Sequence, residues 1–255
     1  MTTPFAVPTP PPPPEPTQQG GSTWVMPALV AIAVAIAALV IGGLVYWRAV
    51  PSAPMLPPVP GLVKASGPNG VTIEDAQPVF DQVAAEWLPG AQPIRIVMEV
   101  DWSSLPPDAK ATTLPPGGVI SAVYVAPWDA PFGKRQEAAA LTMEVERGGG
   151  MMVTMQSQGW GAMPDLAPVG GAPKVTSAEA LLIAEEEGGR EYRASCPGVH
   201  NQVRVSWATT GPDAPYWAVT YNDARVPEKY GMLMRIDGES GLVLEAREIS
   251  QPCGE

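Results

Sequence analysis

The chain has 255 residues and a formal net charge of −11, with 26 acidic side chains against 15 basic ones. A surface this acidic repels nucleic acid and anionic lipid headgroups, so we expect no nucleic-acid partner and no charge-driven contact with a membrane surface. The length allows one domain of ordinary size or two small ones.

Residues 1–23 form a proline-rich tail that includes the run from Pro10 to Pro14. Consecutive prolines favour extended polyproline II structure and prevent a packed core. We expect a disordered, solvated tail. The alternative is a ligand for an aromatic-lined groove on another protein. The tail has no basic residue, so it does not match a secretory signal peptide.

An uncharged apolar segment follows at residues 24–47, bounded by Trp24 and Trp47. As a helix, the residues between these tryptophans would be roughly 33 Å long, enough to cross a hydrocarbon core about 30 Å thick. Trp24 at one end and Tyr46 with Trp47 at the other fit the aromatic belts of a membrane interface. The sequence therefore predicts a single transmembrane helix, followed by a Pro-rich stalk at residues 48–70.

Two signals disagree about membrane orientation. Arg48 follows the span and the tail has no basic residue, so the positive-inside rule places the C-terminal domain in the cytoplasm. Cys196 and Cys253 are the only cysteines, and such a pair indicates a disulfide in an oxidising compartment. We expect the Cys196–Cys253 disulfide and an extracytoplasmic domain; two free thiols or half of a metal site are the alternatives.

Residues 71–155 predict one helix and four strands. Apolar side chains recur at helical spacing up to Trp87, and a Pro-Gly pair ends the helix. We place its start near Asp75, because Pro78 then falls in the first turn, where a missing N–H costs little. Strands are predicted at residues 94–100 and 119–125, and a hairpin at 141–155 across three glycines.

Residues 156–174 predict a linker, and residues 175–255 repeat the pattern. Thr176 and Glu179 form a capping box at the start of a helix that we expect Gly188 and Gly189 to end. Predicted strands follow at residues 202–207, 217–221, 233–236 and 242–244.

A short repeat joins these two segments. Val71-Thr72-x-x-x-Ala76 recurs as Val175-Thr176-x-x-x-Ala180, each time at the start of a helix followed by strands and a closing hairpin. The expected fold is α+β: one transmembrane helix, then two units, residues 71–155 and 175–255, each a helix on a small antiparallel sheet.

Catalytic residues are not evident in the sequence. His200 is the only histidine and could pair with Cys196, but a loop histidine beside a disulfide is the simpler interpretation. The run from Glu185 to Glu187 could bind a cation, although a helix end with three glutamates is more simply a solvated face. We expect a protein that is not an enzyme and holds no cofactor.

Methionines offer one alternative chemistry. Met151, Met152 and Met155 could bind Cu(I) through their thioethers outside the cytoplasm. In a regular strand, Met151 and Met155 lie on one face and Met152 on the other. This pattern also fits ordinary core packing, so a copper-handling accessory subunit is kept as the alternative function.

Residues 175–255 resemble a PepSY domain. The likeness rests on the Ser-Ala-Glu-Ala stretch at 177–180, the strand at 216–221 and the hairpin at 235–244. That hairpin matches the family's Ile-Asp…Thr-Gly ending, with Ser240 where threonine is usual. Residues 123–127 are similar to a strand of PepSY-associated membrane proteins, so residues 71–155 are a weaker PepSY-like unit.

The resemblance implies a non-catalytic module on the outer side of a bacterial membrane that binds other proteins or inhibits peptidases. A helix on a small sheet leaves a sheet face or edge for a partner strand. Trp160, in the predicted linker, could add an anchoring contact. We therefore expect a single-pass, extracytoplasmic protein-binding module that modulates a peptidase or another envelope partner.

Overall fold

The computed structural model describes residues 34–41, 53–58, 61–129, 138–161, 173–196, 203–208, 215–222 and 231–248. It separates into two units, residues 1–50 and 51–255. In the first unit, residues 34–41 are an exposed helical segment, and the rest of the predicted span, with Trp24 and Trp47, lies outside the described residues. None of the helices in the described ranges is both long and apolar enough to cross a membrane.

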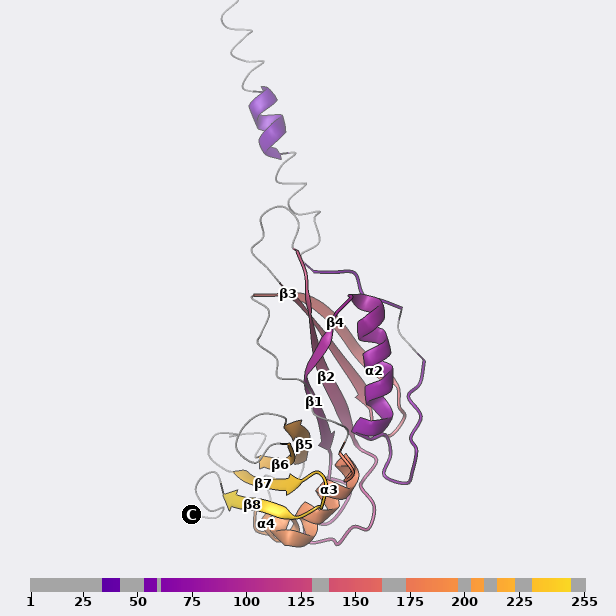
Figure 1. Cartoon of the computed structure of the whole chain (residues 1–255), viewed down its shortest axis with the longest axis vertical. Helices are drawn as coiled ribbons and strands as arrows, with labels where there is room; N and C mark the ends of the chain where they lie inside the picture. Colours follow the sequence, from indigo (N-terminus) through magenta and orange to yellow (C-terminus); the bar gives the residue numbers. More distant parts are fainter. Residues whose placement is uncertain are drawn as a thin grey trace, which may run out of the picture. The chain divides into compact units, whose positions relative to one another are not determined.

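The second unit contains one antiparallel sheet of eight strands in the order β4-β3-β2-β1-β5-β6-β7-β8, with helices packed against it (Figure 1). This confirms the predicted α+β class. The first half comprises α2 (Ile73–Trp87), β1 (Gln92–Val100), β2 (Gly118–Pro127), β3 (Ala138–Glu146) and β4 (Met152–Trp160). The second half comprises α3 (Ser177–Ala184), the kinked segment Glu185–Gly189, α4 (Arg190–Ser195), β5 (Val203–Ala208), β6 (Tyr216–Asn222), β7 (Gly231–Asp237) and β8 (Val243–Glu248).

The two halves repeat the order of one helical region and four strands, but they share a single sheet. β1 pairs with β5 through Val97–Val100 and Val203–Ser206, and residues 51–255 form one compact unit. The core lies on the face of the sheet covered by helices, because α2 contacts β1 to β3 and α3 contacts β5 to β7.

The first helix begins two residues earlier than expected. Thr72 and Asp75 form a capping box, and this sets the first helical residue at Ile73. Pro78 consequently lies inside the helix rather than in its first turn. The prediction of a start near Asp75 was wrong because the capping box of Thr72 and Asp75 was not recognised.

Two predicted boundaries are also corrected. The strand β4 extends to Trp160, so residues 156–160 belong to the sheet and not to a linker. The end of the predicted stalk belongs to the domain, since Val63 is buried and its N–H donates to the carbonyl of Gly150 at 2.8 Å. Asn69 likewise binds the N–H of Leu114 through its side chain at 2.9 Å.

The closing hairpins of the two halves have the same geometry. In each hairpin, the last residue of the inner strand, β3 or β7, donates its N–H at 2.9 Å to the carbonyl of the residue just after the turn. A glycine with positive φ in the turn donates its N–H back to the carbonyl of that last residue. A bulge then interrupts the pairing of the two strands. The matched residues are Glu146 with Asp237, Gly150 with Gly241, and Met151 with Leu242.

Each hairpin also binds the start of the helix in its own half. The carbonyl of Arg147 accepts the N–H of Val71 at 2.9 Å, and the carbonyl of Gly238 accepts the N–H of Val175 at 2.9 Å. The residues that follow these valines, Thr72 and Thr176, are the two helix N-caps. The short sequence repeat therefore marks equivalent positions in space.

Candidate functional site

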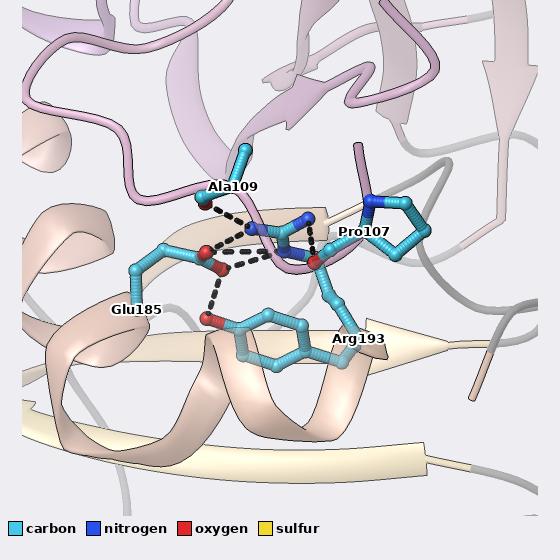
Figure 2. A network of polar contacts seen from close by, with 5 residues as sticks. Pro107, Ala109, Glu185 and Arg193 are labelled. Atoms are coloured by element: carbon cyan, nitrogen blue, oxygen red, sulfur yellow. Dashed lines mark hydrogen bonds and ion pairs between the residues drawn. The ribbon is translucent and has the colours of Figure 1, made fainter. Parts of the chain in front are cut away.

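A buried ion pair lies where α3 passes into α4 (Figure 2). Arg193 is fully buried and Glu185 is 6 % exposed, and two guanidinium nitrogens contact the carboxylate at 2.5–3.1 Å. In a continuous α-helix, residues eight apart point about 80° apart around the axis. The chain is kinked between them, where Glu187 and Gly188 leave helical geometry, and the two side chains meet across this kink.

Helical geometry ends at Glu187 and Gly188, so the glycine pair ends the regular helix as the sequence predicted. Gly188 adopts a φ of +119°, which a residue with a side chain rarely adopts, and a second short helix, α4, begins at Arg190 after this kink. A Cβ on Gly189 would collide with the hydroxyl of Tyr221, so a side chain cannot fit there. The predicted solvated face at 185–187 was wrong for Glu185, which faces inward.

The ion pair belongs to a larger network. The hydroxyl of Tyr221 donates to Glu185 at 2.9 Å, and Arg193 donates to the carbonyl of Pro107 at 2.9 Å. The guanidinium also lies 4.2 Å from the ring centroid of Trp102, in cation–π geometry. Burial, and then the negative charge of Glu185, raise the pKa of Tyr221 well above its usual value. At neutral pH this tyrosine is a neutral hydrogen-bond donor.

A second buried arginine follows β3. Arg147 is fully buried, and its partners among the described residues are backbone carbonyls, those of Val71 at 3.2 Å, Pro115 at 2.7 Å, Gly117 at 2.9 Å and Asn69 at 2.5 Å. Burial lowers the pKa of Arg147 to about 10, so it remains charged at neutral pH. No carboxylate among the described residues pairs with this charge. Carbonyl dipoles stabilise it instead.

Together the two arginines fix the long connection between β1 and β2, residues 101–117. Arg193 binds the carbonyls of Pro107 and Ala109, the second at 3.5 Å, while Arg147 binds those of Pro115 and Gly117. Both guanidinium groups are inaccessible to solvent and their donors are directed at internal acceptors. Their geometry stabilises the fold and offers no position for a substrate.

The two long helices are joined at their first turns. Glu74 of α2 accepts the N–H and the hydroxyl of Ser177 at 2.7 and 2.8 Å, and the hydroxyl oxygen of Ser177 accepts the N–H of Ile73 at 3.3 Å. Carboxylates and hydroxyls at helix starts satisfy N–H groups that have no partner within the helix. Each helix therefore helps to cap the other.

Of the predicted cysteine and histidine residues, only Cys196 is described. It is buried, 2 % exposed, and disulfide-bonded. Cys253 and His200 lie outside the described residues. The Cys196–Cys253 pairing and any Cys–His contact therefore stay predictions.

The three methionines of the copper alternative do not share a face. Met152 and Met155 pack against the core, whereas Met151 is 55 % exposed. The bulge opposite Glu144 and Val145 shifts the alternation, so the predicted grouping of Met151 with Met155 was wrong. Within the described ranges, no group of three or more His, Cys, Asp or Glu side chains is placed to hold a metal ion.

The accessible chemistry lies on the face of the sheet opposite the helices. Glu99 of β1 pairs with Arg204 of β5 at 2.9 Å, across the seam between the halves. Arg235 contacts Glu245 at 3.0 Å and lies 5.0 Å from the ring centroid of Tyr216. One register row runs across this face through Thr154, Glu144, Ser121, Val97, Ser206, Ala218, Arg235 and Glu245. Most of these side chains are half-buried and Val97 is buried. We name the sheet face opposite the helices the open face and treat it as the candidate site.

Sequence reasoning missed Arg147, Arg193 and Tyr221. One signal was available for Arg193, because the buried Tyr192 and Cys196 are four positions apart, as in a second helix that follows the glycines. No pattern marks Arg147 as buried, since it precedes a glycine-rich turn that is usually exposed.

Comparisons with known proteins add little to this description. No protein-family model and no curated protein matches the chain. A solved structure from Clostridium difficile 630, described as a "putative lipoprotein", is similar over 72 % of this chain and 96 % of that chain, at 12 % sequence identity and a TM-score of 0.41. A similarity of this size assigns neither a family nor a function.

Proposed function

We propose that this chain is a membrane-anchored, extracytoplasmic module that binds another protein and has no catalytic activity of its own. The observation that carries the proposal is the contrast between the buried charges and the open face. Arg147, Arg193 and Glu185 are enclosed and held by internal partners. The open face instead presents polar side chains and cross-strand ion pairs toward the outside.

The open face has the properties of a specific protein interface. It is built on one continuous eight-stranded sheet, so its side chains are held at fixed spacings. The ion pairs Glu99–Arg204 and Arg235–Glu245 hold charges of both signs in fixed positions. Fixed charges of this kind select partners by electrostatic complementarity more than they add affinity. The resemblance of residues 175–255 to PepSY domains favours a peptidase or another envelope protein as the partner.

One feature supports a location outside the cytoplasm and another supports a membrane anchor. Cys196 is disulfide-bonded, and structural disulfides persist in oxidising compartments. The apolar segment at residues 24–47 has the composition of a single membrane anchor. We therefore place the second unit on the outer side of the membrane.

Photo-cross-linking of the full-length chain in its native membrane tests the binding face. A photoreactive residue is placed at Ser121 or Ser206, which flank Val97 on the open face. The control position is Ala85, which is exposed on α2. We expect a discrete cross-linked product from both serine positions and not from Ala85. Products of equal yield from all three positions would show that the open face is not the binding surface.

Thiol labelling tests the compartment. Denatured but unreduced full-length protein should react with no thiol reagent, because Cys196 is disulfide-bonded. After reduction, both cysteines of the chain should react. Two reactive thiols before reduction would remove the support for an extracytoplasmic location.

A further inference from the structure

The two outer strands of the sheet close equivalent hairpins but differ in charge. Counting from the matched pair Met151 and Leu242, the charged residues of β8 correspond to uncharged residues of β4. The corresponding pairs are Glu245 with Thr154, Arg247 with Gln156, and Glu248 with Ser157. Charged side chains on an outer strand oppose pairing with a further strand. One edge of the sheet is therefore protected by charge and the other is not.

The strand β4 lacks the other common forms of protection as well. Its nine residues, Met152–Trp160, include no charged residue and no proline. Its one bulge lies at the start, near Val153, and from Thr154 to Trp160 it pairs with β3 in an unbroken register. Long outer strands with these properties are the ones that recruit another strand.

The alternation of hydrogen bonds shows which groups of β4 face outward. Glu146 donates its N–H toward the β4 side, so the even-numbered residues of β3 direct their backbone groups to β4. Their partners on β4, such as Gln156 and Gln158, direct theirs to β3. Met155, Ser157 and Gly159 therefore direct their N–H and C=O groups away from the sheet. No backbone hydrogen bond recorded between described residues uses these groups.

We propose that β4 pairs with β4 of a second copy of this chain, in antiparallel orientation, so that the sheet continues from one copy into the next. The net charge of −11 opposes contact between two copies over most of their surface. The uncharged edge of β4 is where they can meet without bringing like charges together. Antiparallel self-pairing is a two-fold symmetric contact, the commonest arrangement of homo-oligomers.

Side chains along β4 fit this occupant. Thr154, Gln156 and Gln158 alternate on the open-face side and can hydrogen-bond to the same residues of the second copy. Met151 and Val153, which are 55 % and 43 % exposed, lie where β4 begins. Contact with the second copy removes part of their apolar surface from water. A two-fold axis perpendicular to the sheet keeps both open faces on the same side, so the dimer presents two adjacent copies of the binding face proposed above.

The first test is the oligomeric state of the full-length chain, measured by sedimentation over a range of protein concentrations in detergent. Wild-type protein should be dimeric, and the Gln156→Lys/Gln158→Lys variant should dissociate at concentrations at least tenfold higher than wild type. The control is Leu244→Lys on β8, which, like Gln156 and Gln158, is exposed to solvent and should leave the dimer unchanged. A wild-type chain that is monomeric at every concentration, or a lysine effect equal on both strands, would overturn the proposal.

The second test is a cysteine scan of β4, which does not depend on how the variants fold in detergent. Single cysteines at Thr154, Gln156, Ser157 and Gln158 are oxidised in native membranes. An antiparallel pair should give disulfide-linked dimers with one maximum along the strand and lower yields on either side. Arg247→Cys on β8 is the control and should give none.

Failure of this proposal is distinguishable from failure of the proposed function. Loss of β4 cross-links with the open-face cross-links intact would overturn only the dimer. Cross-links from the β4 cysteines to a different protein, in place of a second copy, would also overturn self-pairing. Cross-linked dimers without any product from Ser121 or Ser206 would support the dimer and contradict the open-face site.

Discussion

The two closing hairpins have the same backbone geometry, but the residue after the inner strand, β3 or β7, has a large side chain in one hairpin and none in the other. In the first half this residue is Arg147, whose buried side chain reaches four carbonyls. In the second half it is Gly238, where a Cβ would collide with the ring of Trp207. In both halves its carbonyl binds the residue before the helix N-cap. Main-chain hydrogen bonds thus maintain the repeated geometry, while different side chains fill the space around it.

Among the described residues, each half contains one fully buried arginine, and the two have different partners. Arg147 is surrounded by neutral carbonyls, whereas Arg193 is paired with the carboxylate of Glu185. Removing either leaves buried acceptors unpaired, but only the loss of Arg193 leaves a buried charge. The following predictions test how far this difference between the halves extends.

The largest effect is expected for Arg193→Met, which should lower the free energy of unfolding by about 3–5 kcal/mol because Glu185 is left as a buried, uncompensated charge. The Glu185→Leu/Arg193→Met variant should recover part of this loss, since it removes both charges. Urea unfolding measures both values. A double variant no more stable than Arg193→Met would contradict the interpretation.

Arg147→Met is the matched variant in the first half and should cost about 3 kcal/mol, because four main-chain carbonyls lose their donor. These acceptors are backbone atoms, so no second substitution can remove them. A loss under about 1 kcal/mol would show that water replaces the guanidinium.

A smaller effect is expected at the equivalent glycine. Gly238→Ala should cost about 1–3 kcal/mol, because the new methyl group overlaps the ring of Trp207. Gly149→Ala in the first hairpin is the control, since its nearest contact is an ordinary 3.6 Å to a carboxylate oxygen of Glu146. Thermal unfolding should separate the two variants by several degrees, and equal losses would contradict the steric explanation.

Alkaline pH should destabilise both halves through one tyrosine each. Burial and the contact with Asp81 raise the pKa of Tyr124, and burial and Glu185 raise that of Tyr221. Above pH 10 both ionise only in the unfolded chain, so each lowers the free energy of unfolding by about 1.4 kcal/mol per pH unit. Arg147, whose pKa in the folded protein is about 10, loses its proton at lower pH in the folded protein than in the unfolded chain. This raises the free energy of unfolding as the pH rises and offsets the contribution of one tyrosine.

Single Tyr124→Phe and Tyr221→Phe variants isolate these contributions. Each should reduce the loss of stability above pH 10 by about 1.4 kcal/mol per pH unit relative to wild type, as measured by urea unfolding between pH 9 and pH 11. A pH profile unchanged by either substitution would mean that the tyrosine ionises in the folded protein.

The smallest effect is expected at the seam between the halves. Arg204→Gln removes the ion pair with Glu99, which is partly exposed, so the loss should be about 0.5 kcal/mol. The loss should disappear in 1 M salt because exposed charges are screened. A loss several times larger that survives salt would show that the ion pair, and not backbone pairing, holds β1 to β5.

Local patterns predicted much of the fold. Alternating apolar residues located the core strands, and three glycines after Glu146 and the Asp-Gly pair at Asp237 located the two hairpins. The capping box of Thr176 and Glu179 correctly gave the start of α3. Each of these signals lies within a few residues of the element it predicts, which is why the sequence reveals it.

Features set by distant residues could not be predicted. The two glycines predicted the end of α3 but not the kink that directs Glu185 toward Tyr221, a residue of a distant strand, nor the second short helix that follows. The burial of Arg147 depends on carbonyls contributed by residues 69–71 and 115–117. The open face follows from the pairing of β1 with β5, which has no local signal.

The seam between β1 and β5 has a consequence for folding during synthesis. Glu99 and Arg204 are separated by 105 positions, and Glu74 and Ser177 by 103. At about 5–20 residues per second, a ribosome needs roughly 5–20 s to produce the second half after the first has emerged. During this interval the inner edge of β1, which β5 later covers, is unpaired. Recruitment of a chaperone to the nascent first half is therefore expected to end when β5 is released.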